Sequence, residues 1–275
     1  MKARWMVLFV GGLVVSACAS APVTTPPPNV PPPTQRAAPT QALPATQSPV
    51  APTSMPTVAT VATQPVQETG PREATFQTED GVTLSGTLFG QGKVGVVLSH
   101  MYPTDQTSWH AFAQTLADNG YLALAYDFRG YGQSGGEKRI DQIDRDVRAA
   151  AEFLRGQGAQ RIVLAGASMG GTASAKVAGS VGADGLIVLS SPQSFQGMTV
   201  TADDLKSFAG PSLWIGSRGD TATADTEAMH ALANAPKTIH IYSGSAHGTY
   251  IFDTGDEADL IQRLLEFLLA SFPPE

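Results

Sequence analysis

Short apolar segments alternate with amphipathic segments along most of the chain after residue 94. The apolar runs over residues 94–99, 121–126, 162–165, 185–189, 212–215 and 238–242 are typical of buried strands. Helical patterns lie between or after them, over 109–119, 140–156, 172–181, 223–235 and 258–272. This alternation favours an α/β fold with a mostly parallel, twisted sheet and helices on both faces. An antiparallel hairpin over 74–77 and 82–88 is expected to precede it.

The first 71 residues differ in composition from the rest of the chain. Fourteen of the 20 prolines fall between Pro22 and Pro71, among Thr, Ala, Gln and Val. Such sequence buries too little apolar surface to form a core and favours extended conformers. We therefore expect a disordered Pro/Thr-rich linker over residues 19–71 and one folded domain over residues 72–275.

Residues 1–18 have the pattern of an export signal peptide. Two basic residues precede an apolar run over 5–15, which is too short to span a bilayer. The run leads into VSAC, which resembles the lipobox of bacterial lipoproteins, and Cys18 is the only cysteine of the chain. The resemblance implies lipidation of Cys18 and a membrane-anchored protein of the cell envelope. The alternative is ordinary cleavage at the small residues, which would give a secreted protein.

Charge and histidine spacing limit the range of partners. The net charge is −7 and there is no basic stripe, which argues against a nucleic-acid partner. The five histidines show neither paired spacing nor clustered carboxylates or cysteines. We expect no metal and no cofactor.

A single serine lies between glycines where a predicted strand meets a predicted helix. Gly166-Ala167-Ser168-Met169-Gly170 has the G-x-S-x-G spacing of a nucleophile elbow. A turn this tight leaves no space for a Cβ atom two residues either side of the serine. The serine hydroxyl is expected to project at the carboxyl edge of the sheet, where the following helix supplies an N–H group and a partial positive charge.

An acid and a base follow the serine in the order that such a nucleophile needs. Asp220 comes just after the strand over 212–215, and His247 lies on the loop after the strand over 238–242. The order Ser, Asp, His is that of a nucleophile-elbow triad. Carboxyl ends of parallel strands share one edge of a sheet, so the three residues are expected to lie together.

With these motifs, residues 72–275 resemble the α/β-hydrolase family, specifically its small serine hydrolases without a large lid. Asp127-Phe128-Arg129-Gly130-Tyr131-Gly132-Gln133-Ser134 is similar to the family's D-x-R-G-x-G-x-S loop. The resemblance implies the α/β-hydrolase fold without a large cap domain, with Ser168, Asp220 and His247 as catalytic residues.

The same resemblance implies an oxyanion hole made of two backbone N–H groups. His100 stands where the family has its His-Gly segment, but Met101 replaces the glycine. By motif position the donors are the N–H groups of Tyr102 and Met169, with Met101 as the alternative to Tyr102.

Other polar residues have structural explanations. Asp203 and Asp204 compete with Asp220 as the acid, but their pattern is typical of the start of a short helix. Asp127 and Arg129 are expected to stabilise their own turn. The remaining histidines are expected to pack or lie on the surface: His100, His110, His230 and His240.

The expected activity is hydrolysis of small carboxylic esters through an acyl-enzyme. Residues 191–210 are too few for a cap domain, so we expect an open cleft, with Tyr102, Tyr250 and Phe252 along its acyl side. Alternatives are an aminopeptidase or oligopeptidase, a thioesterase or acyltransferase, and a surface binding module with a decayed site. The substrate and the oligomeric state do not follow from the sequence.

Overall fold

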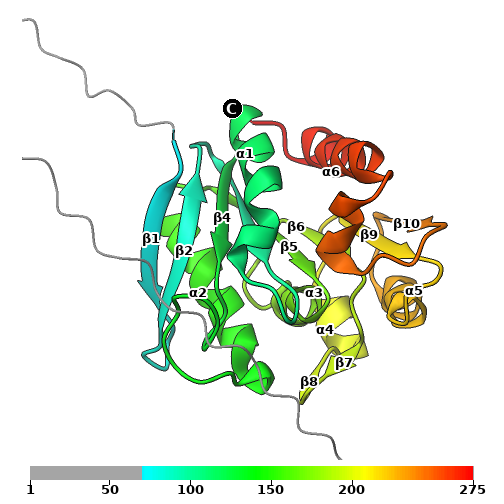
Figure 1. The fold of residues 1–275 in the computed structure, drawn as a ribbon, viewed down its shortest axis with the longest axis horizontal. Coiled ribbons are helices and arrows are strands. Elements are labelled where there is room, and N and C mark those ends of the chain that lie inside the picture. Colours follow the sequence, from blue (N-terminus) through cyan, green and yellow to red (C-terminus); the bar gives the residue numbers. More distant parts are fainter. Residues whose placement is uncertain (1–69, 275) are drawn as a thin grey trace, which may run out of the picture. The chain divides into compact units, whose positions relative to one another are not determined.

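The structure, a computed structural model, describes residues 70–274. The predicted signal peptide with Cys18 and nearly all of the predicted linker lie outside the described residues. An eight-stranded sheet runs through residues 70–274, with the strand order β1-β2-β4-β3-β5-β6-β9-β10 (Figure 1). Its strands are β1 (Arg72–Gln77), β2 (Thr83–Phe89), β3 (Val94–Ser99), β4 (Leu122–Tyr126), β5 (Arg161–Ala167), β6 (Gly185–Leu189), β9 (Ser212–Ser217) and β10 (Lys237–Tyr242).

The sheet is mostly parallel, as predicted. The six strands from β4 to β10 pair in parallel, whereas β1 pairs with β2 and β2 with β4 in antiparallel fashion. The predicted hairpin at the start of the domain is confirmed as β1 and β2. Strand β5 lies between β3 and β6 and is completely apolar in its centre, because both of its faces are covered.

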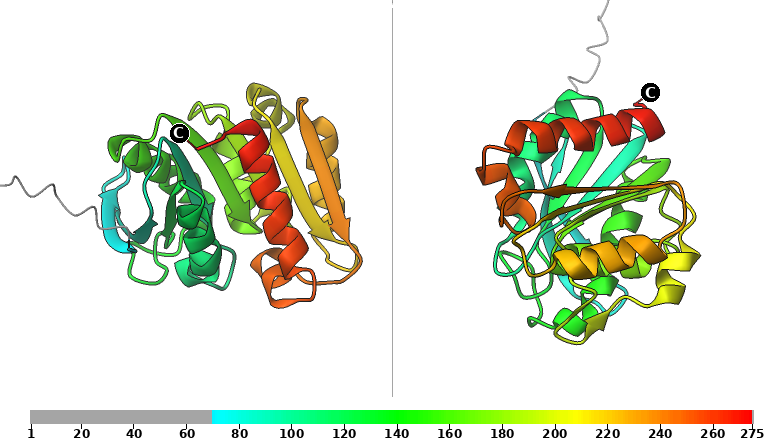
Figure 2. Two further views of the ribbon diagram at one scale, coloured as in Figure 1. Left: turned by 90° about the horizontal axis from the view of Figure 1, so that it is seen from above. Right: turned by 90° about the vertical axis from the view of Figure 1, so that its right-hand side faces the viewer.

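Helices cover both faces of the sheet (Figure 2). One face packs against α2 (Ile143–Gly156), α3 (Met169–Val177) and α5 (Thr223–Leu232), and the other against α1 (His110–Asp118) and α6 (Glu257–Ser271). Alternate residues of β5 divide between the two layers: Ile162 and Leu164 face the first, Val163 and Ala165 the second. The two-layered core holds the strand ends, and so the loops that follow them, in fixed positions.

The last helix packs against the sheet, as its periodicity indicates. Leu260, Leu264 and Leu268 of α6 are fully buried in the second layer. Among residues 70–274, no helix has the length and apolarity that crossing a bilayer requires.

The segment after β6 contains no cap domain. It forms a small hairpin, β7 (Ser194–Phe195) and β8 (Met198–Thr199), and the short helix α4 (Ala202–Ser207). The predicted short helix at Asp203 and Asp204 is confirmed, and a capping box at Thr201 starts it. The hairpin was not predicted. The remaining elements of the described residues are three short 3-10 helices, η1 (Gln106–Trp109), η2 (Ile140–Gln142) and η3 (Gly248–Asp253).

Candidate active site

Ser168 occupies a strained turn between β5 and α3. Its backbone has φ 50° and ψ −121°, a conformation that residues other than glycine rarely adopt. A Cβ atom at Gly166 would collide with the backbone of Gly170, and one at Gly170 with the carbonyl oxygens of Ser99 and His100. Glycine is therefore required at both positions, for the steric reason that the sequence suggests.

Ser168 is more enclosed than a residue projecting from the sheet edge would be. It is 5% exposed, and it contributes to the wall of a cavity of about 320 Å³. His247 contributes to the same wall, so the structure brings the predicted nucleophile and the predicted base to one cavity.

Asp220 and His247 form a close pair. The ring nitrogen Nδ1 of His247 lies 3.0 Å from Oδ1 and 2.9 Å from Oδ2 of Asp220. The side chain of Asp220 is 4% exposed and that of His247 is 31% exposed. Because a carboxylate only accepts hydrogen bonds, Nδ1 of His247 carries the proton and donates it to Asp220. Nε2 of His247 is therefore left to accept a proton.

The three residues come from the carboxyl ends of β5, β9 and β10, which lie at one edge of the sheet. The hydrogen bonds recorded within residues 70–274 do not include one between Ser168 and His247. A bond of this kind is often long before substrate binds, so its absence does not separate the two residues.

His100 connects the segment after β3 to the loop after β4. Its Nε2 accepts from the N–H of Phe128 (3.1 Å), so its Nδ1 donates to the carbonyl oxygen of Met101 (3.0 Å). Burial lowers the pKa of this fully buried imidazole, which favours the neutral form that these two bonds need. The predicted structural role of His100 is confirmed.

Met101 directs its side chain away from the cavity. The residue is fully buried, and its Sδ lies 2.7 Å from where a Cβ atom at Gly248 would be. Gly248, with φ +57°, directly follows His247, so the missing side chain there makes room for the one added at residue 101. The replacement of glycine by methionine is thus accommodated in the core.

The predicted oxyanion donors lie beside this region. Met169 is the first residue of α3, and Tyr102 follows Met101. Within residues 70–274, no acceptor is recorded for the N–H of Met169, Tyr102 or Met101. Of the three residues, only Tyr102 lines the cavity, while Met101 and Met169 are fully buried beside it.

Arg129 is the centre of a buried ionic network. It bonds to Asp146 on α2, which is fully buried, at 2.6 Å, and to Asp80 in the β1–β2 turn at 2.8 Å. The Arg129 bond lowers the pKa of Asp80. Asp127 accepts from the N–H groups of Gln106 and Gln133. Asp127 and Arg129 therefore stabilise the loop that contains them, as predicted.

The rest of the cavity wall comes from residues that the sequence did not single out as site residues. They are Pro192, Phe195, Thr221, Ala222 and Asp225, and Tyr102 completes the wall. Phe195 belongs to the β7–β8 hairpin and Asp225 to the first turn of α5.

Two residues expected along the cleft lie elsewhere. Tyr250 and Phe252 line a separate hollow of about 360 Å³, beside α1. The ring of Phe252 lies 5.8 Å from that of Trp109 and 5.7 Å from that of Phe112, so aromatic packing holds it in the core layer. The expectation for these two residues was therefore wrong.

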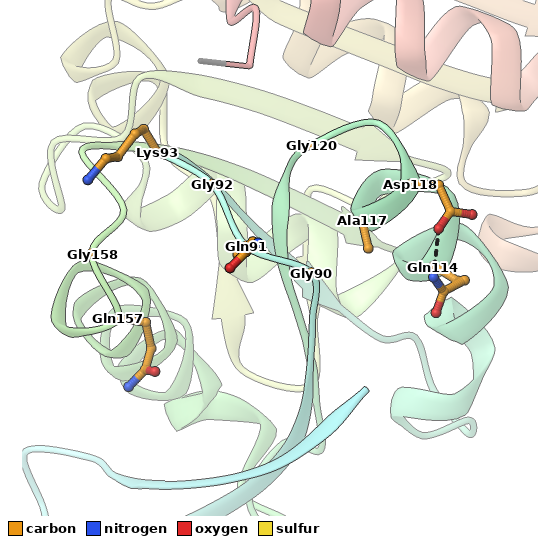
Figure 3. Close-up of a pocket in the computed structure, with 10 residues that line it drawn as sticks. All are labelled: Gly90, Gln91, Gly92, Lys93, Gln114, Ala117, Asp118, Gly120, Gln157 and Gly158. Carbon is orange, nitrogen blue, oxygen red and sulfur yellow. Dashed lines mark hydrogen bonds between the residues drawn. The ribbon is translucent and has the colours of Figure 1, made fainter. Parts of the chain in front are cut away.

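A larger hollow, of about 720 Å³, lies at the other end of the strands, and Figure 3 shows the residues that line it. It is lined by loops that precede β3, β4 and β5, so it faces away from the strand ends that carry Ser168 and His247. Its one carboxylate, Asp118, accepts a hydrogen bond from Gln114 at 2.8 Å. This hollow contains none of the predicted site residues.

The other histidines take no part in the cavity. Each packs against an aromatic ring: His110 against Phe89, His230 against Trp214 and His240 against Tyr242. In the part of the chain that the structure describes, no three His, Cys, Asp or Glu side chains are grouped as metal ligands.

Comparison with known proteins links part of the chain to hydrolases. Residues 91–196 match a family described as Hydrolase_4, serine aminopeptidase, S33. An uncharacterized protein of Mycobacterium tuberculosis is 31% identical over 106 residues, 36% of this chain and 38% of that protein. Bifunctional epoxide hydrolase 2 of Sus scrofa is 32% identical over 93 residues, 33% of this chain and 17% of that protein. The match thus spans well under half of the curated relatives.

Solved structures resemble a larger part of the chain. The Pyrococcus furiosus esterase Pf2001 superposes with a TM-score of 0.64 at 21% identity, covering 73% of this chain and 92% of the esterase. At 21% identity, this superposition shows a shared fold and nothing finer.

Proposed function

The chain has the α/β-hydrolase fold, and from that premise we propose that it is a serine hydrolase that cleaves carboxylic esters. Ser168 is the nucleophile, His247 the base and Asp220 the residue that orients the base. The observation that carries the proposal is the cavity that Ser168 and His247 share, with Nδ1 of His247 bonded to Asp220 at 2.9 Å. Esterases among the structural neighbours add support at the level of fold.

The proposed reaction has two steps, each with His247 as the proton carrier. Oγ of Ser168 attacks the ester carbonyl while Nε2 of His247 accepts its proton and then delivers it to the leaving alcohol. Asp220 keeps the proton on Nδ1 and stabilises the imidazolium. Water then attacks the acyl-enzyme by the same route. The N–H of Met169, with that of Tyr102 or Met101, stabilises the oxyanion, where losing one donor typically costs ~3 kcal/mol.

A serine nucleophile favours acyl carbonyl substrates over epoxides, the substrates named for the relative from Sus scrofa. A serine that opens an epoxide becomes an alkyl ether, which has no carbonyl for water to attack. The enzyme would stop after one turnover. An ester instead gives an acyl-serine, which the same histidine and oxyanion donors can hydrolyse.

The size of the cavity and the missing cap favour short esters. The segment between β6 and β9 supplies only a hairpin and a short helix, so no domain encloses a long chain. A cavity of about 320 Å³ is at the lower end for small-molecule sites. Hydrolysis rates are therefore expected to fall once the acyl chain outgrows the cavity; rates that rise steadily beyond a dozen carbons would contradict this.

An aminopeptidase is the second candidate, because the matched family carries that description over residues 91–196. The triad chemistry is the same, and only the leaving group differs. Aminoacyl p-nitroanilides assayed beside p-nitrophenyl esters separate the two, and preference for the anilides would replace the esterase proposal. Thioesters assayed in parallel test the thioesterase alternative.

A fluorophosphonate probe tests for the nucleophile itself. Wild-type protein is expected to be labelled and Ser168→Ala not. Ser194→Ala, which removes an exposed serine of the hairpin, is the matched control and should be labelled like wild type. No labelling of the wild type would leave the binding-module alternative, and equal labelling of Ser168→Ala would show that Ser168 is not the reactive residue.

We further propose that the enzyme is exported and anchored at the cell envelope through a lipid on Cys18, with residues 19–71 as the tether. The lipobox-like VSAC and the proline-rich segment after it support this. Cys18→Ala should move the protein from the membrane fraction to the soluble fraction. Membrane retention of that variant would contradict lipidation, and a soluble wild type would favour plain secretion.

A further inference from the structure

The cavity beside Ser168 contains a carboxylate that the proposed hydrolysis does not use. Asp225 is half-buried in the first turn of α5 and lines the cavity together with Ser168 and His247. The helix N-terminus supports its negative charge. Its Oδ2 accepts from the N–H of Gln193 at 3.0 Å, which fixes the direction of the carboxylate.

No cation neutralises Asp225 within residues 70–274. The ion pairs recorded there do not include it, and no Lys or Arg lines the cavity. Lys176, which contacts the nearby hairpin through the carbonyl of Thr199, lies 3.9 Å from Asp204 instead. The cavity therefore has a negative charge that is left for a ligand.

Two aromatic rings line the same cavity. Tyr102 and Phe195 lie with ring centroids 6.1 Å apart and an interplanar angle of 50°, and Tyr102 is 47% exposed. The bond from Gln193 to Asp225 ties the start of the hairpin that carries Phe195 to α5. Tilted aromatic faces beside a carboxylate are the groups that bind organic ammonium ions.

We propose that this cavity selects esters that carry a positively charged ammonium group, with Asp225 as the anionic partner and Tyr102 and Phe195 as the aromatic partners. The inference rests on the proposed ester hydrolysis and names its substrate class. A cationic ester gains the attraction of Asp225 and of both rings. An ester with a free carboxylate is repelled by the same residue.

Isosteric ester pairs test the proposal without changing shape. Acetylcholine and 3,3-dimethylbutyl acetate differ by N⁺ against C on the alcohol side. Ethyl esters of betaine and of 3,3-dimethylbutyric acid differ in the same way on the acyl side. The quantity measured is the ratio of kcat/KM for the charged ester to that for the neutral ester, in wild type and in Asp225→Asn.

Asp225→Asn keeps an oxygen for the N–H of Gln193 and removes the charge. The ratio is expected to fall about tenfold for at least one of the two pairs, and the wild-type ratio to fall as salt is added. Glu227→Gln removes an equal charge from the exposed face of the same helix and should leave the ratio as in wild type. Comparing ratios between proteins cancels the different intrinsic reactivities of the esters.

Three outcomes would overturn the inference or its basis. An equal loss of kcat/KM on the charged and the neutral esters in Asp225→Asn would mean that Asp225 has only a structural role. A ratio equal to that of wild type for both pairs would leave no cationic subsite, while the proposed esterase stands. Failure of wild type to hydrolyse any of the four esters, charged or neutral, together with no labelling by a fluorophosphonate, would refute the proposed function itself.

Discussion

Replacing Ser168 by glycine is expected to stabilise the protein while removing the proposed nucleophile. With φ 50° and ψ −121°, Ser168 has the backbone conformation of the first central residue of a type II′ turn, where glycine is preferred. Ser168→Ala removes the same hydroxyl but keeps the Cβ atom and so keeps the strain. Comparing the stabilities of these two variants isolates the free energy of the strained backbone at residue 168.

The magnitude follows from two opposing costs. A residue other than glycine held in such a region costs about 1–3 kcal/mol, which glycine relieves. Glycine loses roughly 0.5–1 kcal/mol more backbone entropy on folding. Because the residue lies at the cavity wall, the loss of Cβ contacts is small. The net gain is about 1 kcal/mol, or about 2–4 °C in Tm for a domain of this size.

Thermal unfolding of Ser168→Gly and Ser168→Ala measures the difference in Tm between them. Gln196→Gly provides a matched control, because Gln196 is exposed, has φ 45° and is expected to gain stability for the same reason. If Ser168→Gly melts at or below the Tm of Ser168→Ala while Gln196→Gly gains, the turn at Ser168 stores no strain and this reasoning is wrong.

Three further variants test the packing around the site. Gly170→Ala would place a Cβ atom 2.5 Å from the carbonyl oxygen of His100. Such a clash costs ~1 kcal/mol or more, which lowers the Tm of a domain of this size by about 2–4 °C or more, so the yield of soluble protein should drop sharply. A Tm within about 1 °C of wild type would contradict the close approach. Asp146→Asn leaves Arg129 buried without its main partner, and chemical denaturation should show a loss of about 3–5 kcal/mol; a loss below 1 kcal/mol would mean that the pair is dispensable. The lowered pKa of His100 means that the unfolded chain takes up its proton first as pH falls, so stability from this group is complete above about pH 6.5 and is lost below it. His100→Asn should flatten that part of the stability–pH curve, and an unchanged slope would assign it to other groups.

The strands and the order of the proposed triad were predictable because each depends on local sequence. The apolar runs 94–99 and 185–189 coincide with β3 and β6. Helix α3 begins at Met169, three residues before the predicted start, because Gly170 and Gly171 are poor helix formers by propensity yet are required by packing. Tertiary contacts overrode the local preference there.

Ser168, His247 and Tyr102 were predicted at the cavity, but the rest of its wall could not be predicted, because it depends on how separate loops meet. Phe195 and Asp225 are far apart in sequence and neither belongs to a motif. One local signal was available for the hairpin that carries Phe195. Gln196 and Gly197, with φ 45° and 90°, form a two-residue turn with positive φ at both positions, and Gly197 stands at the second position, where such turns prefer glycine. Nothing in the sequence indicated that this hairpin borders the site.

The outermost position of β10 makes the proposed catalysis sensitive to local unfolding. This strand pairs with β9 alone, and four of its six residues are partly exposed, whereas the strand that leads to Ser168 has a neighbour on each side. His247, the proposed base, follows the strand that can fray first, so heat is expected to abolish the proposed activity before the rest of the domain unfolds. The rate of hydrolysis would then fall at a temperature at which circular dichroism still shows a folded protein.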